Sequence, residues 1–334
     1  MSTKTILITD TKFVMGGSMQ EAALLKKGFR INRITKFPIS EADLVTAIQE
    51  VDGYILGGIE KVTSPVINSA KKLKVIAFTG SGYTEYIPAY EEATAKGIAI
   101  STAKGENAQS VAEFTMGLVF RMIRAGMEDT AQISIADWKK NRELKGLTLG
   151  IIGYGTIGKI VRRIAGVIGL DVKIYTRDKL NAKNAKFVSL EELVETADIV
   201  SLHVNKEHGK NVLSRSYLAK MKDGSIVINA AFPEAVDLMA LYEELANARL
   251  RAAFDKPPQG KDYEVITGFY ENLRMGDPQS KVYYASSSQV AWDTVQANNR
   301  VSESVTRSLI NLLETGKDRN LVNRKYSRFS KARK

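Results

Sequence analysis

The sequence predicts an α/β protein of two domains, each built on a parallel sheet. Short apolar runs alternate with helical stretches along the whole chain, as is typical of parallel strands that are buried on both faces. One of these runs ends in the glycine-rich turn GYGTIG (153–158), which leads directly into a helix. The chain has 334 residues, enough for about two domains. We therefore expect one nucleotide-binding unit and one further α/β unit.

Composition excludes several classes of protein. With 44% hydrophobic and 25% charged residues, the chain has the balance of a soluble globular protein. It has no cysteine, which excludes disulfides, thiolate metal sites and a cysteine nucleophile, and we predict no metal site. The start, MSTKTILITD, leads into a strand without a signal-peptide core, and no apolar run has the length of a membrane span. We expect a cytoplasmic protein that does not bind membranes.

The net charge of +11 is concentrated near the end of the sequence. Residues 323–334 hold six basic side chains and no acid. Contact with nucleic acid through counterion release is one interpretation of such a segment. A solvated segment that aids solubility is the other, and we favour it because no nucleic-acid-binding motif accompanies the charge.

The pattern along the chain assigns the elements in order. In the first part, apolar runs predict strands, and the stretches between them include two helices; the strands are 4–9, 53–57, 74–79 and 98–101, and the helices 41–51 and 64–72. A long helix is expected next, then the strands of the nucleotide unit, then a closing amphipathic helix; the ranges are 110–132 for the long helix, 149–152, 172–175, 198–204, 224–231, 249–255 and 281–287 for the strands, and 290–316 for the closing helix.

The glycine-rich turn is the most informative motif. An apolar strand precedes it, a helix with small and apolar residues follows, and a second strand completes the unit. Gly153 turns the chain, Gly155 lets backbone approach a pyrophosphate, and Gly158 packs helix against strand. The exposed N–H groups and the helix dipole then hold the phosphates. This context predicts a Rossmann-like dinucleotide site whose first part consists of Gly153, Tyr154, Gly155, Thr156, Ile157 and Gly158.

The end of the second strand bears on the choice of nucleotide. An acid there usually binds the ribose diol of NAD, but this chain has Thr176 and Arg177. A hydroxyl and a guanidinium suit a 2′-phosphate, so NADP(H) is favoured. NAD(H) stays possible if Arg177 only covers the adenine face, and Asp178 one residue later weakens the preference.

Several further runs resemble the D-isomer-specific 2-hydroxyacid dehydrogenase family. They fall in order over nearly the whole chain: LKVIAFTGSGYTEYIP (73–88), SVAEFTMGLVFRMIR (110–124), RELKGLTLGIIGYGTIG (142–158), ADIVSLHV (197–204), MKDGSIVINAA (221–231) and AAFD (252–255). The resemblance implies a nucleotide domain, 104–290, inserted in a discontinuous substrate domain, 1–103 with 291–334. It also implies a homodimer formed through the nucleotide domain and its long helix. The resemblance places His203, Asn205 and Ala230 on the cofactor side of the site. Asp255 resembles the family residue that binds the nicotinamide carboxamide.

The resemblance fails at the three positions that carry the family's chemistry. Phe232, followed by Pro233, stands where the family has the arginine that orients a carboxylate. Gln289 stands at the position of the histidine that protonates the carbonyl, and the supporting glutamate has no clear match, Glu264 being nearby but shifted. The chain has only two histidines, at 203 and 208, and neither is placed to replace the missing acid. Ordinary 2-hydroxyacid chemistry is therefore not expected.

Four residues are the candidates for contact with substrate. Gln289 can donate a hydrogen bond but no proton at neutral pH. Phe232 makes its side of the substrate site apolar and cannot bind a carboxylate as an arginine does. Lys104 and Tyr83 are possible proton donors if their surroundings lower their pKa. The turn GSG (80–82) offers backbone N–H groups to an anion or a carbonyl oxygen. The alternative for each side chain is an ordinary packing or surface role.

Three functions are compatible with these residues. The first is a divergent NAD(P)-dependent oxidoreductase acting on a small carbonyl or alcohol substrate without the usual carboxylate. The second is a non-catalytic nucleotide-binding sensor or scaffold, and the third an enzyme that uses bound NAD(P) transiently. The retained glycine turn and Asp255 favour the first.

Overall fold

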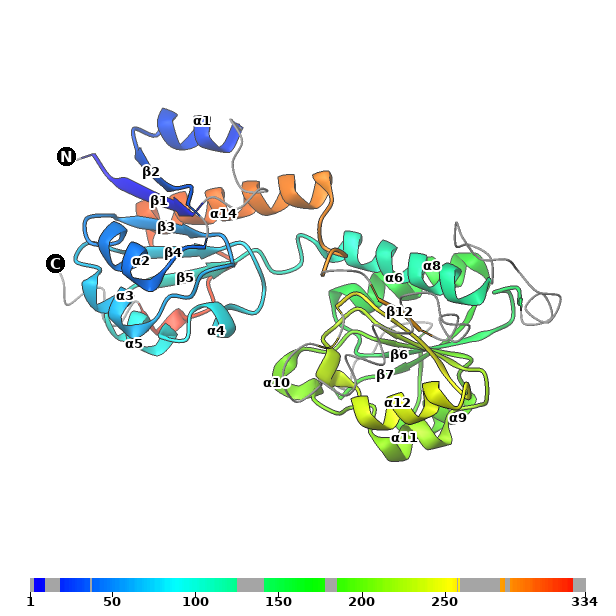
Figure 1. The fold of residues 1–334 in the computed structure, drawn as a ribbon. Coiled ribbons are helices and arrows are strands. Elements are labelled where there is room, and N and C mark those ends of the chain that lie inside the picture. The colour runs from blue at the N-terminus through cyan, green and yellow to red at the C-terminus, as the bar shows by residue number, and fades with distance from the viewer. Residues whose placement is uncertain are drawn as a thin grey trace. The chain divides into compact units, whose positions relative to one another are not determined.

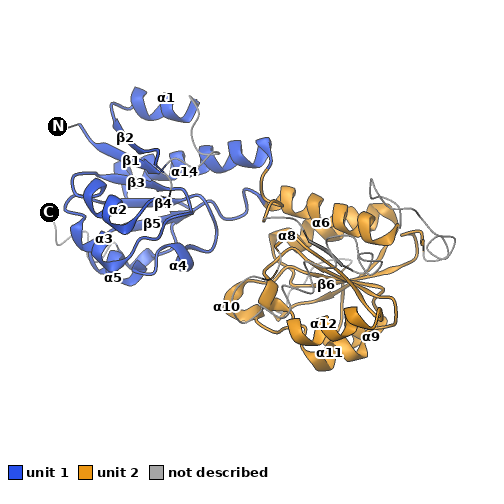
Figure 2. Ribbon diagram, viewed as in Figure 1, with its two compact units in different colours: residues 1–107, 294–334 blue, residues 108–293 orange. Residues whose placement is uncertain are grey.

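The computed structural model describes residues 3–9, 19–36, 38–124, 141–177, 185–256, 258, 283–285 and 289–326. The chain divides into two compact units, residues 1–107 with 294–334 and residues 108–293 (Figure 2). Unit 1 thus ends after residue 107, where the sequence predicted 103, and resumes at 294, where it predicted 291. Lys104 consequently belongs to unit 1.

Unit 1 is a five-stranded parallel sheet covered on both faces (Figure 1). Its strand order is β2-β1-β3-β4-β5. Alternate residues of β1 enter opposite cores: Leu7 packs with α2, α3 and α5, while Ile6 and Ile8 pack with α1 and α14. The elements are β1 Thr5–Thr9, α1 Met19–Lys26, β2 Arg30–Ile34, α2 Glu41–Ala47, β3 Gly53–Leu56, α3 Ser64–Ser69, β4 Val75–Phe78, α4 Tyr83–Tyr86, α5 Tyr90–Ala95, β5 Ala99–Thr102, α14 Val295–Thr315 and the 3-10 turn η4 Arg324–Tyr326.

Unit 2 is a seven-stranded parallel sheet in the order β12-β11-β10-β9-β6-β7-β8. Helices α6 and α8 cover one face, and α9, α11 and α12 cover the other (Figure 1). The elements are α6 Ala108–Ile123, β6 Thr148–Ile152, α8 Thr156–Ile168, β7 Asp171–Tyr175, β8 Lys186–Phe187, α9 Leu190–Thr196, β9 Ile199–Leu202, α10 Lys206–Gly209, α11 Arg215–Lys220, β10 Ile226–Asn229, the 3-10 turn η1 Pro233–Ala235, α12 Leu238–Ala246, β11 Arg251–Phe254 and β12 Tyr283–Ala285.

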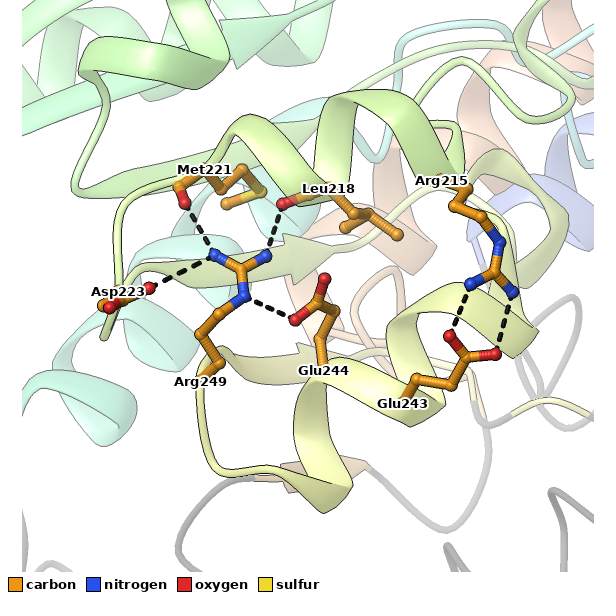
Figure 3. A network of polar contacts seen from close by, with 7 residues as sticks. All are labelled: Arg215, Leu218, Met221, Asp223, Glu243, Glu244 and Arg249. Atoms are coloured by element: carbon orange, nitrogen blue, oxygen red, sulfur yellow. Dashed lines mark hydrogen bonds and ion pairs between the residues drawn. The ribbon is translucent and has the colours of Figure 1, made fainter.

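A polar network ties α11 to α12 and to the turn between α12 and β11 (Figure 3). The guanidinium of Arg249 donates to the carbonyl oxygens of Leu218 and Met221, both at 2.7 Å, and so satisfies backbone acceptors at the end of α11. It also pairs with Glu244. Arg215 and Glu243 form a separate bidentate pair on the surface.

The predicted fold class is confirmed: both units are α/β with parallel sheets. The predicted helix 290–316 was wrong at its start. Thr294 caps the helix by accepting a hydrogen bond from the N–H of Ala297 at 3.2 Å, so α14 begins only at Val295. Helix α6 is described to Ile123, and residues 125–132 of the predicted helix 110–132 lie outside the described residues. Of the helices in the described ranges, none has the length and apolar character of a membrane span.

Candidate nucleotide-binding site

The predicted cofactor residues all lie at the carboxyl edge of the sheet of unit 2. The glycine turn follows β6, Thr176 and Arg177 follow β7, and the remaining ones follow β9, β10 and β11. Strands β6 and β9 are neighbours, and the chain order runs outward from them in both directions. Such a crossover point is where open parallel sheets bind nucleotides.

Each glycine of the turn has a distinct constraint. Gly153 has φ +98°, and a side chain there would overlap the carbonyl oxygen of His203. A side chain at Gly158 would overlap the carbonyl oxygen of Gly153, so the start of α8 packs directly against the turn. Gly155 is exposed and has open space where a Cβ would be. Gly153 and Gly158 are therefore required by the fold, whereas Gly155 leaves room for a ligand.

The N-terminus of α8 is suited to a phosphate. The helix has 13 residues, and its N-cap, Gly155, has no side chain to accept a hydrogen bond from the first amides. Those N–H groups and the positive end of the helix dipole favour an anion. The residues present therefore fit the pyrophosphate of a dinucleotide, which when bound supplies hydride transfer at its nicotinamide.

Two residues of the turn have packing roles. Tyr154 is buried, and its ring packs edge-on against Phe187 at a centroid distance of 5.6 Å. Ile157 packs on a small apolar cluster that contains Ala230 and Ala291. Through this cluster the glycine turn contacts the residue that follows β10 and the segment after β12.

Thr176 and Arg177 lie beside the glycine turn. The N–H of Gly153 donates to the carbonyl oxygen of Tyr175 at 2.9 Å, which joins the ends of β6 and β7. Thr176 is half-buried and Arg177 is exposed. Asp178 lies outside the described residues.

His203 is neutral in this environment. Burial lowers its pKa to about 4, and its Nε2 shares a 2.9 Å hydrogen bond with Ser201 Oγ. Nδ1 is buried and has no partner among the described residues. A neutral imidazole at neutral pH can exchange hydrogen bonds but is a poor acid. Asn205 is exposed and immediately precedes α10.

Asp255 binds the backbone of residues 290–291, a contact that the sequence did not predict. Its side chain is 3% exposed, and Oδ1 accepts hydrogen bonds from the N–H groups of Val290 at 3.0 Å and Ala291 at 2.9 Å. Ser110 Oγ donates to the carbonyl oxygen of Ala291 at 2.6 Å. The backbone beside Gln289 is thus fixed from two sides. The serine is 181 positions from its partner, and no local pattern predicts such a contact.

The four substrate-site candidates fall into two groups. In unit 2, Gln289 is exposed next to the segment held by Asp255, while Phe232 is 7% exposed and packs in the core with α9, α11 and α12. In unit 1, the N–H of Ala103 donates to the carbonyl oxygen of Gly80 at 3.2 Å, so residue 103 contacts the 80–82 turn. Lys104, the next residue, is exposed. Tyr83 begins α4 and is half-buried.

The fold and the glycine turn together define a nucleotide-binding protein of the Rossmann class. Residues 116–261 match the family described as "D-isomer specific 2-hydroxyacid dehydrogenase, NAD binding domain". The chain is 34% identical over 226 residues to hydroxypyruvate reductase of Thermotoga maritima, covering 66% of this chain and 73% of that one. It therefore belongs to the D-isomer-specific 2-hydroxyacid dehydrogenase family, as the motifs predicted, and with it to the nicotinamide-dependent dehydrogenases.

Other comparisons agree. D-3-phosphoglycerate dehydrogenase of Methanocaldococcus jannaschii is 33% identical over 243 residues, which are 69% of this chain and 46% of that longer protein. The NAD⁺-bound 3-phosphoglycerate dehydrogenase of Entamoeba histolytica superposes with a TM-score of 0.77 at 24% identity, over 96% of this chain and 99% of that one, and shows the shared fold.

Proposed function

We propose that this protein is a divergent oxidoreductase that uses NADP(H) in preference to NAD(H). It transfers hydride to or from a carbonyl or alcohol group of a small substrate that is not an ordinary 2-hydroxy acid. The observation that carries the proposal is a glycine turn whose helix, α8, has no side-chain cap at its N-terminus, together with two substitutions at family positions. Phe232 and Gln289 stand where the family resemblance implies the arginine and the histidine.

The residues of unit 2 limit what the substrate can be. Phe232 offers no guanidinium fork to a substrate carboxylate, because its phenyl ring packs in the core of the unit. Gln289, fixed through Asp255, donates a hydrogen bond to the substrate heteroatom without giving up a proton. In unit 1, Lys104 and Tyr83 are the proposed sources of a proton for carbonyl reduction.

The first test concerns the nucleotide. Replacing Arg177 with alanine is expected to weaken NADPH about tenfold, or about 1.4 kcal/mol, and NADH much less, because only NADPH has a 2′-phosphate for the guanidinium. Fluorescence titration of the purified protein with each nucleotide measures this. Lys210→Ala, which removes an exposed cation following α10, is the matched control. Equal losses for both nucleotides would show that Arg177 does not bind the 2′-phosphate.

Turnover of the nucleotide, measured after the titration, separates the alternative functions. We propose an enzyme because the cradle is intact, but a nucleotide sensor would also bind NADPH. An enzyme oxidises NADPH repeatedly with a carbonyl substrate, whereas a sensor does not. Nucleotide that co-purifies and is reduced only once per protein molecule, measured by mass spectrometry and absorbance, would favour transient use of a bound cofactor. Absence of binding would overturn the proposed function.

A further inference from the structure

A buried carboxylate lies in the turn that follows β3, at the carboxyl edge of the sheet of unit 1. It belongs to Glu60, which is 4% exposed. Its Oε1 accepts hydrogen bonds from the hydroxyl of Tyr54 at 2.7 Å and from the N–H of Gly57 at 3.3 Å. Its Oε2 accepts from the N–H of Ile59 at 3.1 Å, and Thr9 Oγ1 also accepts from Gly57, at 2.9 Å. The three partners of the carboxylate are a phenol and two backbone amides, none of them a cation, so hydrogen bonds alone offset its desolvation.

An ionised carboxylate suits this set of partners better than any other side chain. All three partners are donors, and a carboxylate accepts on both oxygens, whereas an amide would turn an NH2 group toward one of them. Burial and the charge of Glu60 raise the pKa of the Tyr54 hydroxyl well above its usual range, so it stays a donor at neutral pH. The carboxylate therefore fixes the backbone of residues 57–60, which we name the Glu60 turn.

The Glu60 turn is joined to the GSG turn, which follows the neighbouring strand β4. Thr79 Oγ1, one residue before the GSG turn, donates to the carbonyl oxygen of Gly57 at 3.0 Å. A side chain at Gly58 would approach the ring of Phe78 to 3.2 Å, and one at Gly80 would overlap the same ring. Both turns thus lie against one phenyl ring at the end of β4. Because they share these contacts, a displacement of the Glu60 turn is transmitted to the GSG turn.

The GSG turn belongs to the part of unit 1 to which the proposed function assigns substrate contact. Tyr83 follows the turn directly and begins α4. The N–H of Ala103, the residue before Lys104, donates to the carbonyl oxygen of Gly80. A series of contacts therefore leads from Glu60 through the two turns to the segments that carry both proposed proton donors. Supporting contacts of this kind hold a site in its productive geometry without touching the substrate.

We propose that Glu60 is a positioning residue for substrate binding. By fixing the Glu60 turn it holds the GSG turn in the conformation that binds the carbonyl substrate. Its own carboxylate is buried and does not touch the substrate. The affinity for the nucleotide should not depend on it, because the glycine-rich turn and α8 belong to the other unit. The inference rests on the proposed function.

Hydrogen exchange tests the link between the two turns without a substrate. Glu60→Gln places an NH2 group opposite a backbone N–H, so the amides of the Glu60 turn should exchange about tenfold faster, and those of the GSG turn about fivefold faster. Asp52→Asn is the matched control, because Asp52 Oδ2 accepts the N–H of Thr5 at the opposite end of β3. It should leave the exchange of both turns unchanged. Unchanged exchange of the GSG turn in Glu60→Gln would overturn the inference.

Steady-state kinetics separates positioning from a general loss of stability. With cyclohexanone as the carbonyl probe and saturating NADPH, Glu60→Gln should raise KM about fivefold and change kcat by less than about twofold. Tyr54→Phe loses a buried hydrogen bond and should unfold at a lower temperature. It leaves both backbone amides on the carboxylate, so its KM should change by less than about twofold.

The outcomes distinguish the inference from the proposed function. NADPH titration comes first, and a protein that binds no NADPH would overturn the proposed function itself. If NADPH binds, equal KM values for Glu60→Gln and the unchanged protein, or equal increases in Glu60→Gln and Tyr54→Phe, would overturn the positioning role alone. A protein that binds NADPH but does not turn over cyclohexanone would also count against this role, since the edge then binds no simple carbonyl.

Discussion

At the residue scale, the glycines of the nucleotide turn separate folding from binding. Gly155→Ala is expected to fold with a loss of about 1 kcal/mol or less, because open space surrounds the position and φ is negative. Its methyl group lies where a ligand must approach the helix, so the affinity for NADPH should fall at least tenfold. Gly158→Ala should instead lower the stability by several kcal/mol, because the methyl group overlaps the carbonyl oxygen of Gly153.

Thermal unfolding and NADPH titration of both variants check this difference. Gly82→Ala, at another glycine with open space and a negative φ but in unit 1, is the control for adding a methyl group. If Gly155→Ala binds NADPH as the unchanged protein does, the pyrophosphate does not lie against that residue.

The same residues show what a sequence can predict about a site. The glycine turn is local, so its spacing and flanking strand were sufficient to identify it. The link from Asp255 to Val290 joins residues 35 positions apart, and its existence depends on where two strand ends meet. The roles of Phe232 and Gln289 toward a substrate stay predictions, since each was inferred from what is missing at its position.

At the element scale, Arg249 closes the C-terminus of α11. Arg249→Ala leaves the carbonyl oxygens of Leu218 and Met221 without their donor and should cost about 1–2 kcal/mol of unfolding free energy. Arg249→Lys should recover only part of this loss, because an ammonium cannot span both carbonyls and Glu244 as a planar guanidinium does. Denaturant unfolding measures both variants. Arg215→Ala removes the exposed pair with Glu243 and is the control, expected to leave the midpoint unchanged. Equal shifts for both arginines would refute the capping role.

Elements were predictable where burial is complete. Strands β3, β4, β9 and β10 are buried throughout, and their continuous apolar runs identified them. The edge strand β2, Arg30–Ile34, was missed because Arg30, Asn32 and Arg33 interrupt the apolar run of its partly exposed sequence. The two-residue strand β8 is exposed and too short to produce a pattern.

At the scale of the whole molecule, we propose a homodimer formed through α6 and α8. These helices pack together on one face of unit 2. Two large apolar side chains project from them, Phe120 with 41% and Val167 with 86% of the side chain exposed. Exposed apolar residues on adjacent helices are a common feature of subunit interfaces, and the family resemblance implies dimers through this region.

The double variant Phe120→Glu with Val167→Glu tests this interface, because two carboxylates brought into an apolar contact cost more than the contact provides. Light scattering after gel filtration should give twice the chain mass of 36.8 kDa for the unchanged protein and the single mass for the variant. Met239→Glu places one such carboxylate on α12, which covers the opposite face of the sheet, and this variant should remain a dimer. If the unchanged protein has the single mass at micromolar concentration, the exposed side chains of α6 and α8 are ordinary surface residues, and each chain binds its nucleotide alone.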